Sequence, residues 1–233
     1  GCDGSIQILH PAAEKYQKNA CSGTNEPSYP RIRQQESDAF CYLGHQTQIK
    51  PGIMERENMV QLVDEHDNPT GLMEKMDAHR DPHLHRAISI FILNSNGEWL
   101  LHQRSSHKYH SRELWSNACC THPYGGESYS EAAARRLQHE MGMNCPLTLM
   151  FSFIYKAQID DELTEYEYDN VFAAVTDDIP RLNEEEVKDW KYIRFDDLKL
   201  DVENHPEKYS AWFKIIYLRV HSELNGLIFP KDT

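Results

Sequence analysis

Residues 87–103 read AISIFILNSNGEWLLHQ, and this stretch decides the predicted fold. Residues 87–93 are almost entirely apolar and include several β-branched side chains, which is typical of a buried strand. Asn96-Gly97 is a dipeptide that favours a tight hairpin turn, and residues 99–103 return as a second strand-like run. The stretch therefore predicts an antiparallel β-hairpin.

A helix is predicted downstream of this hairpin. Ser128-Tyr129-Ser130-Glu131 has the form of a capping box, in which the first and last side chains each bond to the other's backbone. Alanine and other helix formers continue to Met141, and Gly142 is the expected stop.

The remaining pattern predicts an α+β fold, with a mixed sheet covered by helices. Further strands are expected at residues 59–64, 151–158, 170–176 and 191–195, a turn at 67–71, and a second helix around 212–220. Residues 1–54 follow neither the strand nor the helix period. We interpret them as an irregular N-terminal extension that precedes one domain over residues 55–233.

The composition excludes several classes of partner. Hydrophobic residues make up 39% and charged residues 26% of the chain, as in ordinary globular proteins, and no apolar run is long enough to cross a membrane. The net charge of −13 argues against nucleic acid or an anionic membrane as partner. An anionic small substrate would need a local basic patch and a metal ion.

The six cysteines lack the regular spacing of a disulfide framework, and Cys119 and Cys120 are adjacent. No segment resembles a signal peptide. A reducing compartment fits these features best, so we expect a cytoplasmic protein. The oligomeric state does not follow from the sequence.

Cys120 and His122 form the first candidate site. They stand two positions apart, so an extended backbone directs both side chains to one face. One of them could then bind a metal while the other takes part in chemistry. A buried cysteine pair beside an unrelated loop histidine explains the same residues.

Glu165 and Glu167 repeat this spacing. Two carboxylates held so close repel each other unless a cation or a shared proton lies between them. A solvated edge of an acidic stretch is the alternative, because residues 160–162 are also acidic.

A cluster of histidines, His79, His83 and His85, is the third candidate, although the chain contains 13 histidines in all. Imidazole and carboxylate groups together would make a ligand set suited to Zn²⁺, Mn²⁺ or a similar divalent ion. The members of that set would be His79, His85, His122, Glu165 and Glu167.

Glu140 lies on the same face of the predicted helix as Arg136, where it could present a carboxylate beside the cysteine segment. A surface ion pair between these two residues is the alternative. The basic patch that an anionic substrate requires could be formed by Lys75, Arg104, Lys108 and Arg136, each of which is otherwise an ordinary surface cation.

From about residue 58 to the C-terminal helix, the sequence resembles the type I isopentenyl diphosphate isomerases, a branch of the Nudix superfamily. The most specific matches are residues 84–87, 117–123, 135–142 and 165–167, in this order and spacing. The resemblance implies the Nudix fold, an α/β/α sandwich. It also implies interconversion of isopentenyl and dimethylallyl diphosphate through a tertiary carbocation.

By this resemblance, Cys120 and Glu167 are the proton-transfer pair, and Tyr155 assists the glutamate. The set of three histidines and two glutamates named above would hold one divalent ion, which is Mn²⁺, Zn²⁺ or Mg²⁺. A Mg²⁺ bound to the substrate diphosphate would meet Glu140 and the backbone carbonyl of Cys120. No flavin is implied.

The resemblance assigns Lys75, Arg104, Lys108 and Arg136 to the diphosphate. Trp212 would face the cationic carbon, although its spacing with Ile215 and Ile216 also suits a helix core. Because His79 stands unusually close to residues 84–85, His83 could replace His79 or His85 as a ligand.

A Nudix hydrolase of a nucleoside or other diphosphate is the main competing prediction. The helix of such enzymes reads Arg-Glu-apolar-any-Glu-Glu-any-Gly, whereas residues 135–142 read RRLQHEMG. Of the glutamates in that pattern only Glu140 is present, and the loss of the others argues against hydrolysis, which needs metals that orient a water. A non-catalytic metal-binding module is a further alternative.

Overall fold

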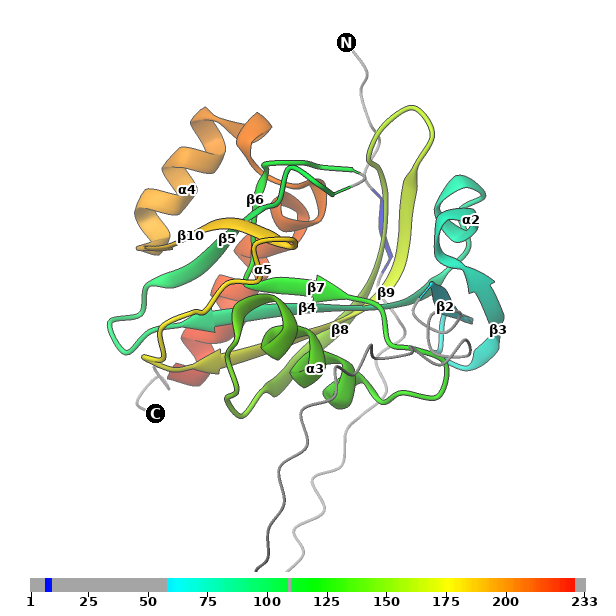
Figure 1. Cartoon of the computed structure of the whole chain (residues 1–233), viewed down its shortest axis with the longest axis horizontal. Helices are drawn as coiled ribbons and strands as arrows, with labels where there is room; N and C mark the ends of the chain where they lie inside the picture. The colour runs from blue at the N-terminus through cyan, green and yellow to red at the C-terminus, as the bar shows by residue number, and fades with distance from the viewer. Residues whose placement is uncertain (1–6, 10–57, 109, 229–233) are drawn as a thin grey trace, which may run out of the picture.

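The long strand β4 (His85–Leu93) organises the sheet in the computed structural model, which describes residues 7–9, 58–108 and 110–228 (Figure 1). On one side it pairs in parallel with β9 (Thr164–Val175) along its whole length. On the other side it pairs antiparallel with parts of β2 (Met59–Val63), β7 (Cys119–Thr121) and β5 (Trp99–Arg104). Helices that cover both faces of the sheet explain why nearly every β4 residue is buried.

The sheet continues outward from these central strands. β9 pairs antiparallel with β8 (Thr148–Gln158), and β8 pairs with the short β1 (Gln7–Leu9). At the opposite end, β2 pairs with β3 (Pro69–Glu74). Parallel and antiparallel pairs therefore coexist, as the predicted mixed sheet requires.

Helices cover both faces of the sheet. Their bounds are α2 (Lys75–Arg80), α3 (Tyr129–Met141), α4 (Phe195–Asn204) and α5 (Ala211–Ile228), with a 3-10 turn at Pro206–Lys208. Figure 1 shows α3 in front of the sheet and α5 behind it. Ile90 of β4 belongs to the core that contains Leu137 of α3, whereas its neighbour Phe91 belongs to the core that contains Phe213 of α5. Period-two alternation along one strand thus supplies both cores.

The predicted helix over residues 129–141 is confirmed with its caps. Ser128 accepts a hydrogen bond from the Glu131 backbone, and the Glu131 side chain accepts one from the Ser128 backbone. Gly142 adopts a left-handed conformation with φ 61° and ends the helix. These local signals act within a few residues, so the sequence alone places them correctly.

The predicted hairpin is confirmed at its turn, but the two strands separate soon after it. Only Ile92–Leu100 and Leu93–Trp99 pair between β4 and β5. Along its other edge β5 pairs with β10 (Val187–Ile193) over its whole length. Farther along, β5 pairs with β6 (Trp115–Ser116), while β7 takes the place beside β4. Both β7 and the segment after β5 then contribute residues to the wall of one cavity.

Several predicted bounds differ from the structure. The turn expected at residues 67–71 lies earlier, because Pro69 already begins β3 and residues 64 and 68 form the turn bond. Strand β9 begins six residues before its predicted start, at Thr164, and Phe195 opens α4 rather than ending a strand. Within the predicted extension, residues 7–9 form β1, and the other residues up to 54 lie outside the described part.

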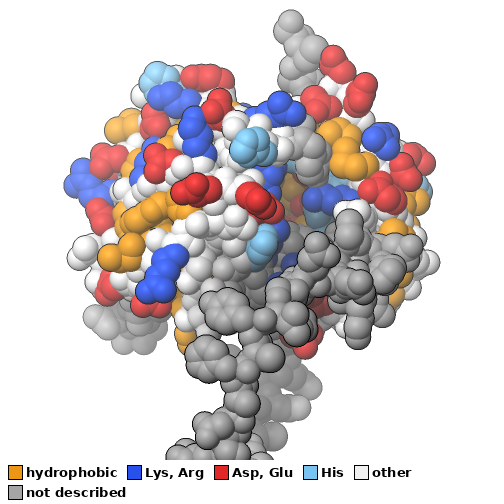
Figure 2. Space-filling view, in the orientation of Figure 1, with side chains coloured by type: hydrophobic (Ala, Val, Ile, Leu, Met, Phe, Trp, Pro, Cys, Tyr) orange, Lys and Arg blue, Asp and Glu red, His pale blue; other side chains and the backbone are white. Residues whose placement is uncertain are grey.

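The surface mixes charges of both signs. Figure 2 shows acidic and basic side chains side by side over the face that it displays. Among the described residues, no helix has the length and apolar character that crossing a bilayer would take.

We expect Gly142→Ala to lower the free energy of unfolding by about 2–4 kcal/mol, because the new Cβ is strained at this backbone φ and also clashes with a neighbouring residue. The φ of 61° disfavours any side chain, and a Cβ at this position would lie 2.7 Å from the Arg181 carbonyl oxygen. Urea unfolding measures the loss.

Gly97→Ala is the matched control. Gly97 also has a positive φ, of 75°, but a Cβ there would meet nothing within 4 Å. Its loss should be only about 1–2 kcal/mol. Equal losses in the two variants would show that the Arg181 contact contributes nothing.

Candidate functional site

One cavity collects most of the residues that the sequence analysis selected. Its walls come from strands β2, β4, β5, β7, β8 and β9, from helices α2, α3 and α5, and from the segments that follow β5 and β7. The predicted residues that line it are Lys75, Arg104, Lys108, Cys120, His122, Arg136, Tyr155, Glu165, Glu167 and Trp212.

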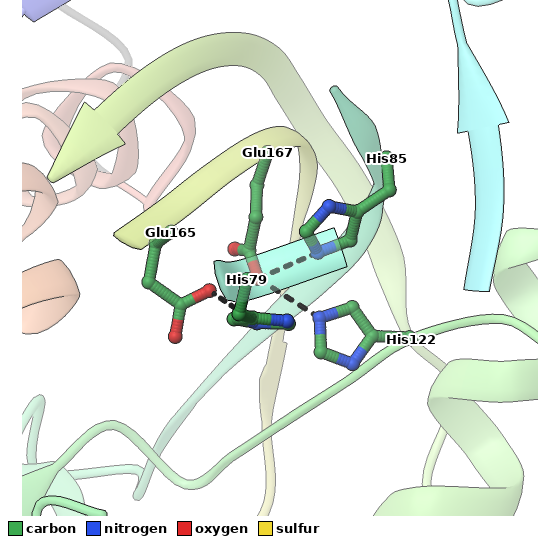
Figure 3. Close-up of side chains that lie close together, drawn as sticks. All are labelled: His79, His85, His122, Glu165 and Glu167. Atoms are coloured by element: carbon green, nitrogen blue, oxygen red, sulfur yellow. Dashed lines mark hydrogen bonds and ion pairs between the residues drawn. The ribbon is translucent and has the colours of Figure 1, made fainter. Parts of the chain in front are cut away.

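Three imidazoles and two carboxylates converge at one end of this cavity (Figure 3). Each offers one ligand atom, and these atoms all lie within 4.8 Å of one another. The group comprises His79 from α2, His85 from β4, His122 after β7, and Glu165 and Glu167 from β9. These five are the residues that the sequence analysis proposed as one ligand set.

Backbone carbonyls set the orientation of two of the histidines. Nδ1 of His79 donates to the Lys75 carbonyl at 2.6 Å, and Nδ1 of His85 donates to the His83 carbonyl at 2.8 Å. A carbonyl only accepts, so in the neutral ring the proton is on Nδ1 and the lone pair is on Nε2. Nε2 of His85 is thereby prepared to act as an acceptor or ligand. Nε2 of His79 is oriented in the same way, but without a metal it carries a proton and donates to Glu165.

The His85 ring supplies a direct test of whether a metal suits this group. Its Nε2 is buried without a hydrogen-bond partner, and the nearest oxygen, Oε1 of Glu167, lies 3.7 Å away. A buried acceptor of this kind is costly unless something else satisfies it. The nitrogen and oxygen donor set therefore fits a divalent cation.

Burial opposes charge on His79, but the hydrogen bond to Glu165 and the charge of that carboxylate outweigh it and raise the pKa of His79. At the other two histidines burial prevails and keeps the ring uncharged. It lowers the pKa of His85 to about 4 and holds the pKa of His122 well below its ordinary value. Neutral imidazole is the form that binds metal.

The pKa values of the two carboxyl groups are shifted in opposite directions. Burial and then the adjacent Glu165 raise the pKa of Glu167 well above its ordinary value. Burial also opposes ionisation of Glu165, but the hydrogen bond from His79, 3.0 Å long, outweighs it and leaves the pKa of Glu165 well below its usual range. Without a cation the pair retains a proton on Glu167; a cation between them would allow both to ionise.

His83 stands apart from this group. Its side chain is 42% exposed and pairs with Asp81 at 3.1 Å, and it contributes only its backbone carbonyl, to His85. The structure thus brings His79 and His85 into the cluster and leaves His83 outside it.

Cys120 faces the same cavity as Glu167, from the opposite strand β7. Burial, followed by the nearby Asp169, raises the pKa of its thiol to about 12, so the sulfur carries its proton. On the other side, the hydroxyl of Tyr155 donates to Oε2 of Glu167 at 2.6 Å. A neutral thiol and a hydrogen-bonded carboxyl group therefore face the same cavity.

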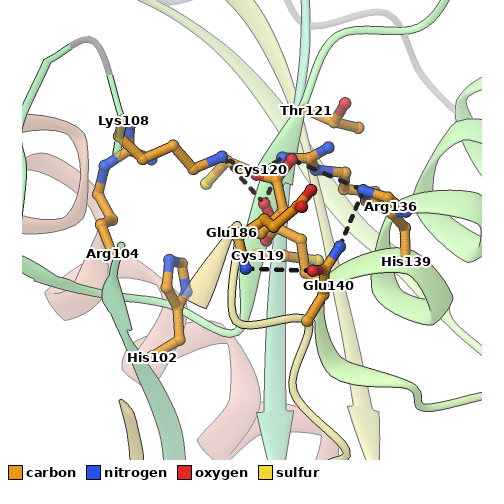
Figure 4. A network of polar contacts seen from close by, with 12 residues as sticks. His102, Arg104, Lys108, Cys119, Cys120, Thr121, Arg136, His139, Glu140 and Glu186 are labelled. Carbon is orange, nitrogen blue, oxygen red and sulfur yellow. Dashed lines mark hydrogen bonds and ion pairs between the residues drawn. The ribbon is translucent and has the colours of Figure 1, made fainter. Parts of the chain in front are cut away.

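A group of alternating charges includes two of the cavity residues, Lys108 and Arg136 (Figure 4). Arg136 and Lys108 each contact both Glu140 and Glu186, and the Arg136–Glu186 distance is 2.8 Å. Glu140 is almost fully buried, and its Oε2 has no hydrogen-bond partner. Burial lowers the pKa of Lys108 to about 8 despite the neighbouring Glu140. Glu186 was not predicted, because nothing distinguishes it within the acidic run at residues 184–186.

Trp212 lies between the helix core and the cavity. It belongs to the core beneath α5, and it also lines the cavity. The Arg104 guanidinium carbon lies 5.1 Å from its ring centroid, and the ring of His110 meets it edge-on at 6.0 Å. His110, a cavity residue that is buried, was missed because it stands in a polar segment without a motif.

Comparison with known proteins identifies the family. The NUDIX domain model matches residues 83–213. An isopentenyl-diphosphate Delta-isomerase of Pectobacterium atrosepticum is 47% identical over 161 residues, which cover 69% of this chain and 90% of the relative. An isopentenyl-diphosphate Delta-isomerase 2 of Aromatoleum aromaticum is 46% identical over 172 residues, covering 73% and 91%.

A crystal structure from Deinococcus radiodurans shares the fold. It superposes with a TM-score of 0.56 at 20% sequence identity, covering 66% of this chain and 93% of that one. At this identity the likeness concerns the architecture alone.

We expect His85→Ala to weaken the binding of Mn²⁺ or Zn²⁺ by more than about 100-fold, because even second-shell partners of a metal contribute 10–100-fold. Isothermal titration of protein first treated with a chelator measures the affinity. The matched control is His83→Ala, which removes a neighbouring imidazole but keeps the backbone carbonyl that orients His85. Equal affinities for His85→Ala and wild type would contradict the assignment of this cluster.

Proposed function

Because this chain belongs to the isopentenyl-diphosphate Delta-isomerases of the Nudix superfamily, we propose that it interconverts isopentenyl and dimethylallyl diphosphate in the cavity described above. One observation carries this proposal. Cys120 and Glu167 reach the same cavity from different strands, and basic side chains line another part of it. A small diphosphate with a short hydrocarbon chain matches that division of charge.

The reaction needs one proton added and another removed. An unactivated alkene is a weak base, so an acid must be aimed at its π electrons, which form the new C–H bond and leave a tertiary carbocation. A second group then accepts a proton from the carbon on the other side, and the C–H electron pair becomes the new double bond. Cys120 and Glu167 take these roles, and their order depends on the direction of reaction.

Tyr155 supports the carboxyl member of this pair. Its hydroxyl is 2.6 Å from Oε2 of Glu167 and is buried with it. A donated hydrogen bond holds the carboxyl group in one orientation and stabilises its ionised form. The same hydroxyl thereby limits which carboxylate oxygen faces the substrate.

Two metal sites complete the proposal. The cluster of three histidines and two glutamates holds Mn²⁺, Zn²⁺ or Mg²⁺, whose charge favours the ionised form of Glu167 when bound. A Mg²⁺ that arrives with the diphosphate is met by Glu140 and by the carbonyl oxygen of Cys120. The unpartnered Oε2 of Glu140 supports its part in this second site.

The cations Lys75, Arg104, Lys108 and Arg136 bind the diphosphate. All four line the cavity, which supplies the local positive charge that a chain of net charge −13 otherwise lacks. Trp212 lines it too, and its ring stabilises the carbocation by roughly 1–2 kcal/mol.

The residues of helix α3 disfavour hydrolysis of the diphosphate. Arg136 and His139 occupy positions of α3 where a Nudix hydrolase would carry acidic ligands, and Arg136 pairs with Glu140 instead. A single helix carboxylate offers too few ligands to hold several metals around an attacking water. An assay for phosphate release, run beside one for double-bond migration, separates the two activities.

We expect Cys120→Ala and Glu167→Gln each to lower turnover by at least about 10³-fold, within the range for loss of an acid–base group. The assay is incubation with isopentenyl diphosphate and Mg²⁺ in deuterated water, followed for the allylic isomer and its deuterium content. Circular dichroism checks that both variants fold. Near-normal isomerisation by either variant refutes its role.

Removal of metal by a chelator should abolish turnover, because the buried carboxylates of Glu165 and Glu167 then retain a proton between them. Adding back Mn²⁺, Zn²⁺ or Mg²⁺ in separate samples shows which ion restores activity. The purified protein should show no flavin absorbance. Full activity after complete metal removal, verified by elemental analysis, is the contrary outcome.

A further inference from the structure

We propose that Ser89 is a positioning residue for Cys120. Its hydroxyl acts with the side chain of Asn117 to hold the sulfur in the direction from which it exchanges a proton with the substrate. This inference rests on the proposed function and assigns it residues that the sequence analysis did not select.

Ser89 stands directly opposite Cys120 in the ladder between β4 and β7. Its oxygen lies 3.6 Å from the cysteine sulfur, and both side chains line the cavity. Ser89 is the one polar residue in the apolar run 87–93 and is only 3% exposed. Burial of a hydroxyl group in such a strand is unfavourable unless the group forms hydrogen bonds.

Asp169 determines which way the Ser89 hydroxyl points. The hydroxyl donates to Oδ2 of Asp169 at 2.7 Å, and the aspartate is buried on the adjacent strand β9. Because the single hydrogen of Ser89 is used in this bond, its oxygen presents lone pairs to the sulfur. Ser89 therefore accepts from the Cys120 thiol rather than donating to it.

Asn117 holds the sulfur from another direction. Its Nδ2 donates to the carbonyls of Ile90 at 3.1 Å and Cys119 at 2.9 Å, which fixes the amide orientation. Its Oδ1 then accepts from the Cys120 thiol at 3.3 Å, and Nδ2 also lies 3.1 Å from the sulfur. The single hydrogen of the thiol is thus shared between two acceptors, Asn117 Oδ1 and the Ser89 oxygen, because both hydrogens of Nδ2 are used on the two carbonyls.

This arrangement serves the chemistry because the sulfur changes protonation state during turnover. A freely rotating thiol would spend much of its time directed away from the reacting carbon, and misplacement of a catalytic group by about 1 Å costs roughly 100-fold in rate. The diphosphate is held by separate cations. Loss of the Ser89 contact should therefore lower kcat and leave KM almost unchanged.

The experiment compares Ser89→Ala with Ser152→Ala. Ser152 lies in β8, and its hydroxyl bonds Oδ1 of Asn170 at 2.5 Å without contacting Cys120, so it controls for loss of a hydroxyl within the sheet. We expect Ser89→Ala to lower kcat by about 10- to 100-fold with KM within twofold, and Ser152→Ala to retain both. Ser89→Thr, which restores a hydroxyl, should recover most of kcat.

A second measurement does not depend on turnover. The infrared S–H stretching band of Cys120 is isolated by subtracting the spectrum of Cys120→Ala, and it should move to higher frequency in Ser89→Ala as the thiol loses an acceptor. It should stay in place in Ser152→Ala. If the wild type shows the hydrogen-bonded band but no isomerase activity, the proposed function fails while the contact stands.

Three results would overturn the proposal. These are an unchanged S–H band in Ser89→Ala, a kcat within twofold of wild type, or a loss that Ser152→Ala matches. If Ser89→Ala does not fold, the nearly isosteric Ser89→Cys gives the kinetic test, and a kcat equal to that of wild type refutes the role.

Discussion

The parallel pairing of β4 with β9 is the constraint on which the site depends. It sets His85 opposite Glu167 and Ala87 opposite Asp169, so the metal-binding end and the thiol-supporting end of the cavity are built on the same pair of strands. A shift of this register by one residue would turn every side chain on one strand to the opposite face. Apolar residues on both faces of β4, in the cores under α3 and α5, hold the register in place.

The second constraint is electrostatic. Glu165 and Glu167 are buried side by side, which no protein interior tolerates without compensating protons, donors or cations. The imidazoles of His79 and His122 and the hydroxyl of Tyr155 form hydrogen bonds with these carboxyl groups, whereas His85 Nε2 remains without a partner. A bound cation would both neutralise the carboxylate pair and give His85 Nε2 a partner. The same reasoning applies to Glu140, whose second oxygen also lacks a partner.

The cavity exists because β5 leaves β4 after two residue pairs. β7 then occupies the vacated edge and carries Cys120 toward the space. The end of β5 and the segment after it bring Arg104 and Lys108 to the cavity wall. One divergence between strands therefore positions both the group that handles protons and the groups that bind phosphate. It also explains how a chain with a strongly negative net charge can present positive charge locally.

Features that depend on near neighbours in the chain follow from the amino-acid pattern. The capping box and Gly142 set the ends of α3, the Asn96-Gly97 turn set the hairpin, and alternation placed Glu165 and Glu167 on one side of a strand. The five candidate ligands were chosen from residue types and from resemblance to a family, and the fold brings them together. Only the tertiary structure decided between His83 and the other histidines, because backbone carbonyls direct His79 and His85 inward. It alone revealed Glu186, His110 and the Ser89–Asp169 contact. Those contacts join residues far apart in the chain, and side-chain periodicity carries no information about which distant strand a residue will face.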